Sequence, residues 1–123
     1  MMKVGRFEDL NIYKDARLLT KRIYDTTKMQ GFIRDFSLAN QMKRAASSVM
    51  LNIAEGFERK GDKEFAQFLF VAKGSCGEIR AQLDIAFDQS YMEKEVYSSI
   101  RADCEKLSRM ISSLIKYLKK TRV

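Results

Sequence analysis

The sequence predicts an all-α protein: an antiparallel up-and-down four-helix bundle that forms one domain over residues 1–123. Three observations lead to this prediction. The chain has no proline and only six glycines, so few residues interrupt a helix. Residues with good helix propensity make up much of the remainder. Apolar residues recur at intervals of three and four along four successive stretches, which is the spacing of one face of an α-helix.

The first predicted helix follows Asp9, a suitable N-cap residue. Phe7, just before it, is expected to pack onto the end of the bundle. The core-facing positions of this helix are Ile12, Ala16, Leu19, Ile23 and Thr27. Its outer face is predicted to be strongly basic and carries Lys14, Arg17, Lys21, Arg22 and Lys28.

The connection over residues 29–36 is apolar for a loop. We expect Phe32 and Phe36 to close one end of the bundle. Ser37 is the predicted N-cap of the second helix. That helix is expected to end just before Gly61, because glycine often supplies the left-handed residue that follows a helix.

The second helix carries a line of polar residues beside its core stripe. The core stripe consists of Leu38, Met42, Ala45, Ala46, Val49, Ile53 and Gly56. The polar line consists of Gln41, Arg44, Ser48, Asn52 and Glu55, each a helical neighbour of the next. Such a line is typical of a hydrogen-bonded network between helices or subunits, or of a ligand site. We favour the network, which also takes in Arg59, Ser75 and Glu78, because unpaired buried polar groups are costly.

The third predicted helix is capped by Asp62 and carries a second polar line, formed by Ser75, Glu78 and Gln82. If the second and third helices pack antiparallel, Glu78 is the expected charge partner of Arg44. In the same arrangement Ser75 is the expected partner of Asn52.

The far side of the third helix carries the small residues Gly74, Gly77 and Ala81. The aromatic residue Phe70 also points away from the core stripe. Glycine inside a helix costs about 1 kcal/mol relative to alanine, so small residues here suggest the close approach of another backbone. We favour contact with another subunit over a ligand pocket.

The fourth predicted helix has core-facing positions at spacings of four and three, as in helix bundles, at Val96, Ile100, Asp103 or Cys104, Leu107, Ile111, Leu114 and Leu118. Its end is basic and carries Lys116, Lys119, Lys120 and Arg122. These cations either complement the helix dipole or bind phosphate, and the sequence leaves both interpretations open.

The formal net charge is +7, and most of the excess lies on the first and last helices. Such a balance suits nucleic acid or another anionic partner. The chain shows no membrane-spanning run and no signal peptide, so a cytoplasmic protein without membrane contact is expected. Cys76 and Cys104 fall on predicted core stripes and are expected to be buried thiols.

The sequence contains no histidine, which excludes Ser–His and Cys–His nucleophiles and the usual zinc sites. It also contains no glycine-rich phosphate loop. Glu55 and Glu78 lack the further ligands that a metal requires. We therefore expect no enzymatic activity, no cofactor and no metal. An enzyme built on Arg44, Asn52, Glu55 and Glu78 is the least favoured alternative.

Several of these residues form a recognisable pattern. It comprises Arg44, Ala45, Ser48, the run Asn52-Ile53-Ala54-Glu55-Gly56, Arg59, and later Ala72, Gly74, Ser75 and Glu78, with Phe7, Asp9, Leu10, Leu38 and Gln41. In this pattern the chain resembles the 23S rRNA intervening sequence proteins over nearly its whole length. It departs from them at Phe32-Ile33-Arg34-Asp35, where that family often has a Phe-Pro-x-Glu sequence.

The resemblance implies an antiparallel four-helix bundle that assembles into a ring, with a pentamer as the expected form. A relative, the accessory variability protein of diversity-generating retroelements, is basic and partners a reverse transcriptase. The family supplies no catalytic residues to transfer to this sequence.

The leading hypothesis is a non-enzymatic homo-oligomer whose basic surface binds RNA or DNA through phosphates. The residues expected to contact nucleic acid are Lys14, Arg17, Lys21, Arg22, Lys116, Lys119, Lys120 and Arg122. The alternative is a protein-interaction scaffold or accessory subunit that binds another protein and has no direct contact with nucleic acid.

Overall fold

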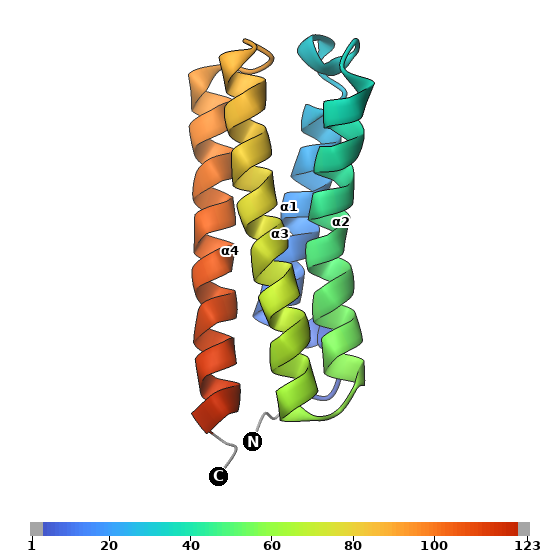
Figure 1. Ribbon diagram of the computed structural model, residues 1–123, viewed down its shortest axis with the longest axis vertical. Coiled ribbons are helices and arrows are strands. Elements are labelled where there is room, and N and C mark those ends of the chain that lie inside the picture. Colours follow the sequence, from blue (N-terminus) through green and yellow to red (C-terminus); the bar gives the residue numbers. More distant parts are fainter. Residues whose placement is uncertain (1–3, 121–123) are drawn as a thin grey trace.

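Four helices run in alternating directions around a shared apolar core (Figure 1). The computed structural model describes residues 4–120. Its elements, in chain order, are η1 (Phe7–Asp9), α1 (Asn11–Thr26), η2 (Gln30–Phe32), α2 (Phe36–Glu58), α3 (Asp62–Asp88) and α4 (Lys94–Lys120), where η marks a 3-10 turn. The predicted all-α four-helix bundle is confirmed.

Each helix packs against the next one in the chain, and α4 closes the bundle by packing against α1. The pairs α1–α3 and α2–α4 therefore lie diagonally across the core. Polar contacts link neighbouring helices at their edges. The Thr20 hydroxyl donates to the Ala46 carbonyl between α1 and α2, and Arg101 forms a 3.0 Å ion pair with Asp84 between α4 and α3. Short connections between neighbours are what fix this up-and-down order.

The predicted core stripes are largely buried, with two shifts of one residue. At the end of α1, Thr26 is buried instead of Thr27, and its hydroxyl donates to the Arg22 carbonyl at 2.7 Å. Near the end of α4, Ile115 is buried while Leu114 is half-buried. A strict seven-residue repeat drifts relative to a straight helix, and this drift brings Ile115 to the core.

Asp35, not Ser37, caps α2. The Asp35 carboxylate accepts a hydrogen bond from the Leu38 backbone N–H at 3.1 Å, while its other oxygen accepts one from the Tyr91 hydroxyl at 3.0 Å. Ser37 is the second residue of the helix, where it only accepts from Gln41. The prediction of Ser37 was wrong because the contact with Tyr91, far along the chain, selects the carboxylate two residues earlier.

The other predicted helix ends also differ from the structure. Asp9 belongs to η1, and Leu10 occupies the N-cap position of α1 without a side-chain hydrogen bond. Asp62 is the first residue of α3, one position after the N-cap Gly61. The left-handed residue after α2 is Lys60, with φ of 63°, and not Gly61.

The connections 27–35 and 89–93 meet at one end of the bundle (Figure 1). Phe32 is fully buried there, as predicted, and its ring centre lies 5.2 Å from that of Tyr91. A Cβ on Gly31 would lie only 2.7 Å from the Tyr91 Cα, so only glycine fits this approach. Phe36 does not close the end: 73% of it is exposed.

Cys76 and Cys104 are buried free thiols, as predicted, on the facing helices α3 and α4. Burial raises the pKa of the Cys76 thiol to about 11. Burial, together with the neighbouring Cys76 and Asp103, raises the pKa of Cys104 to about 12. Within the described chain, no helix has both the length and the apolar character needed to cross a membrane.

Replacing Asp35 by alanine should lower the free energy of unfolding by about 1–2 kcal/mol, because α2 loses its cap and Tyr91 loses its acceptor. Urea unfolding measures the change. Ser37→Ala is the matched control and should change stability by less than about 0.5 kcal/mol. Tyr91→Phe removes one of the two bonds and keeps the cap, so its effect should be the smaller one. Equal effects of Asp35→Ala and Ser37→Ala would contradict the assignment.

The raised thiol pKa values predict an alkaline loss of stability. An unfolded thiol ionises near pH 9.0, whereas the native thiols resist ionisation until about pH 11 and 12. Their contribution to the free energy of unfolding is therefore complete below about pH 9 and is lost as the pH rises toward 12. Urea unfolding at increasing pH should show a steeper decline for the natural sequence than for Cys76→Ala/Cys104→Ala. Identical slopes would contradict the prediction.

Candidate functional site

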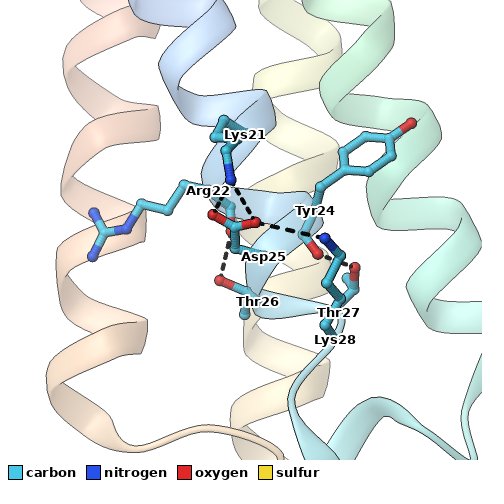
Figure 2. A network of polar contacts seen from close by, with 7 residues as sticks. All are labelled: Lys21, Arg22, Tyr24, Asp25, Thr26, Thr27 and Lys28. Carbon is cyan, nitrogen blue, oxygen red and sulfur yellow. Dashed lines mark hydrogen bonds and ion pairs between the residues drawn. The ribbon is translucent and has the colours of Figure 1, made fainter.

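The structure separates the eight predicted nucleic-acid-binding cations into three groups. Lys21 and Arg22 are bound within the chain. Lys21 Nζ lies 2.7 and 2.8 Å from the two carboxylate oxygens of Asp25. This hydrogen bond, followed by the positive charges of Lys21 and Lys28, lowers the pKa of Asp25. Figure 2 shows this cluster on α1, with the Arg22 side chain turned toward α4.

Arg22 was predicted to lie on the outer face of α1. The structure places it instead at the seam between α1 and α4. Its guanidinium donates to the Asp103 carboxylate at 2.7 Å and to the Ser99 hydroxyl at 2.8 Å. Lys119 is also engaged, because its ammonium lies 5.0 Å from the centre of the Phe70 ring. Both side chains therefore already have roles within the bundle.

The remaining described cations of the prediction are exposed and form no ion pair among the described residues. They are Lys14, Arg17, Lys116 and Lys120. Arg122 lies outside the described residues. Sequence reasoning missed Arg109, which is exposed and precedes Lys116 by seven residues, so it shares the same face of α4. We call Lys14, Arg17, Arg109, Lys116 and Lys120 the cationic residues of the α1–α4 side.

The predicted polar line of α2 lies along an open groove between α2 and α3. The groove has a volume of about 540 Å³ and is lined by Gln41, Arg44, Ala45, Ser47, Ser48, Leu51, Asn52, Glu78 and Gln82. The structure therefore brings together most of the predicted network. Glu55 and Arg59 pair with each other at 3.0 Å further along α2 and do not line the groove.

Ser48 is the centre of a hydrogen-bonded chain beneath the groove. Its Oγ accepts from the Ser75 hydroxyl at 2.9 Å and from Asn52 Nδ2 at 3.0 Å, while Asn52 Nδ2 also donates to the Ser48 carbonyl at 2.8 Å. The predicted direct contact between Asn52 and Ser75 is thus replaced by contacts through Ser48. Because Ser75 is buried, this chain fixes α2 against α3.

The predicted ion pair between Arg44 and Glu78 is absent among the described residues. Both side chains are exposed at the groove, and neither has an ion-pair partner in the described part of the chain. The spacing placed them correctly on facing helix edges. It did not reveal that the two side chains stay exposed without forming an ion pair.

Gln82 is the unusual member of the groove. Only 6% of this residue is exposed, and its Oε1 is buried without a hydrogen-bond partner. An unpaired buried carbonyl oxygen typically costs 1–3 kcal/mol. The sequence placed Gln82 beside the core stripe but gave no sign that its side chain would lack a partner.

The described residues contain no group of three or more histidine, cysteine or acidic side chains able to hold a metal ion. Glu55, considered for a carboxylate pair with Glu78, is already bound to Arg59. The described chain thus combines exposed cations on α1 and α4 with an open polar groove between α2 and α3.

Comparison with known proteins places this architecture in a family. The family profile described as 23S rRNA-intervening sequence protein matches residues 8–113. The chain belongs to the 23S rRNA-intervening sequence protein family. A search of curated proteins found no match. A crystal structure of a protein of unknown function from the S23 ribosomal protein family, from Bacteroides thetaiotaomicron, superimposes with a TM-score of 0.79 and 23% identity, covering 85% of this chain and 98% of that one.

For this intervening sequence protein, the structural likeness supports the bundle and the profile supports the family. Neither assigns a role to an individual side chain. The two surfaces described above, the α1–α4 side and the α2–α3 groove, are therefore the basis for a functional proposal.

The hydrogen-bonded chain yields a stability prediction. Ser75→Ala should lower the free energy of unfolding by about 1 kcal/mol, because the buried contact between α2 and α3 is lost. Ser47→Ala is the matched control, since the Ser47 hydroxyl donates only within α2, to the Lys43 carbonyl. A double-mutant cycle with Ser48→Ala should reveal coupling between Ser48 and Ser75. Additive effects would show that the two hydroxyls act independently.

Proposed function

We propose that this protein is a non-catalytic, cytoplasmic homo-oligomer that binds RNA or DNA through the cationic residues of its α1–α4 side. The observation that carries the proposal is the distribution of charge over the four helices. α4 carries seven basic and three acidic side chains, and α1 carries four and two. In contrast, α3 carries three basic and five acidic side chains, and α2 carries two of each.

Because α1 and α4 are neighbours, the two basic helices lie next to each other in the bundle. Phosphate binding requires cations that are exposed and not already paired, and within residues 4–120 the five cationic residues of this side meet both conditions. No base-reading motif accompanies them, so the recognition would depend on backbone charge and shape. The resemblance implies five copies in a ring, and an assembly would multiply the number of phosphate contacts.

A second candidate function, a scaffold for another protein, is favoured by a different observation. Three large apolar side chains are exposed around the connection between α1 and α2: Met29, Ile33 and Phe36. Clustered exposed apolar residues often mark protein contacts. Contact of this kind would depend little on salt, which distinguishes it from phosphate binding.

Reversing four of the cationic residues tests the leading proposal. The variant Lys14→Glu/Arg17→Glu/Lys116→Glu/Lys120→Glu should lose most of its affinity for structured RNA and duplex DNA in a fluorescence-anisotropy titration. The slope of log K against log salt should become shallower by about one for each phosphate contact removed. Circular dichroism should be unchanged, since these side chains make no ion pairs within the described chain.

The control is a variant with the same net charge but with the reversals outside α1 and α4: Arg34→Glu/Lys60→Glu/Lys63→Glu/Lys73→Glu, all at exposed positions. It should retain most of the affinity. An equal loss in both variants would mean that net charge alone governs binding. If the natural sequence fails to bind even at low salt, nucleic-acid binding is refuted and the scaffold becomes the leading candidate.

A further inference from the structure

The α2–α3 groove contains one unpaired cation, one unpaired anion and one buried unpaired acceptor. Arg44 stands on the α2 wall, and Glu78 and Gln82 stand on the α3 wall. None of the three forms a hydrogen bond or ion pair with the others in the described chain. In a single copy these three polar groups of the groove therefore lack partners among the described residues. The Ser48, Asn52 and Ser75 side chains beneath the groove are hydrogen-bonded to one another.

The two helices that form the groove also expose apolar side chains, of which Leu51 lines the groove itself, and α3 has open space beside one glycine. Leu51, Val71 and Ile85 are 66%, 53% and 49% exposed on α2 and α3. A Cβ added to Gly74 would meet no atom within 4 Å, so packing within one copy does not explain a glycine there. Since glycine inside a helix costs about 1 kcal/mol relative to alanine, the open space suits the backbone of a second molecule.

We propose that a second copy of this chain packs on the α2–α3 groove, and that Arg44 of one copy forms an ion pair with Glu78 of its neighbour. This inference rests on the homo-oligomer proposed above and specifies its contact. In a two-fold pair both bonds form at one contact. In a closed ring each copy gives Arg44 to one neighbour and Glu78 to the other. Either way, both charges are neutralised by identical partners.

Charge complementarity favours a second copy as the occupant. The groove presents a cation and an anion together, so the same surface supplies the groups that it lacks. The α2 and α3 helices have no net positive charge, whereas α1 and α4 are both basic. Two copies meeting through their α1–α4 sides would repel each other, while two meeting through α2–α3 would not.

Charge exchange tests the pairing. Arg44→Glu and Glu78→Arg, each alone, place like charges together and should raise the dissociation constant of the assembly at least about tenfold, as measured by analytical ultracentrifugation. The double variant Arg44→Glu/Glu78→Arg should restore assembly. An equimolar mixture of the two single variants should associate more tightly than either variant alone, because each contact between unlike variants joins opposite charges, which is possible only if the pair forms between copies.

Two further variants separate assembly from folding. Gly74→Arg adds a large side chain where a single copy has open space, so it should abolish assembly and leave helicity and urea unfolding of the monomer intact. Glu58→Arg and Lys73→Glu are the charge controls, exposed on the same two helices outside the groove, and should assemble normally.

The outcomes distinguish this inference from the function on which it rests. If the natural sequence assembles and the exchange restores assembly, the pairing is supported. If it assembles but both single variants and Gly74→Arg assemble equally well, the groove is not the contact, and the proposed homo-oligomer stands without it. If the natural sequence is monomeric at every concentration, both the contact and the homo-oligomer are refuted.

Discussion

The close approach of α2 and α3 at Gly56 is the constraint on which much of the structure depends. A Cβ at Gly56 would lie 2.6 Å from the Phe68 Cβ, so any larger residue would push the two helices apart. At this separation the Ser75 hydroxyl reaches Ser48 at 2.9 Å. The same separation leaves a groove above that contact instead of a filled seam. One glycine thus sets both the buried hydrogen bonds and the surface over them.

The four helices divide their polar chemistry between two sides of the bundle. Between α1 and α4 two ion pairs, Arg22 with Asp103 and Lys106 with Asp15, bridge a pocket of about 310 Å³, while further cations on these helices are exposed. Between α2 and α3 neutral hydroxyl and amide groups join the helices beneath the groove, and Arg44 and Glu78 form no ion pair in the described chain. A molecule built this way has one side suited to a polyanion and another suited to a surface of mixed charge.

The sequence predicted the elements well because burial determines them. Apolar spacing identified all four helices and most of the buried hydrophobic residues, including the two thiols, but not Leu10, Ala39, Ala66, Met92 or Ile115. Helix ends were harder, since Asp35 and Ser37 are both good caps and only the distant Tyr91 decides between them. The sequence identified the residues of the polar line, but it did not predict which of them form hydrogen bonds or ion pairs with one another. Whether Asn52 reaches Ser75 or Ser48, and whether Arg44 reaches Glu78, depends on helix rotation and separation, which spacing alone does not fix.

The contact between Gly31 and Tyr91 has a consequence for how the chain tolerates change in length. It fastens the connection after α1 to the connection after α3, so an insertion in either would force the other to move. The turn between α2 and α3 at the opposite end is bound by no such contact with another connection in the described chain. Added segments, whether fused by design or acquired during evolution, should therefore be accommodated near residues 59–61 more readily than at the other end.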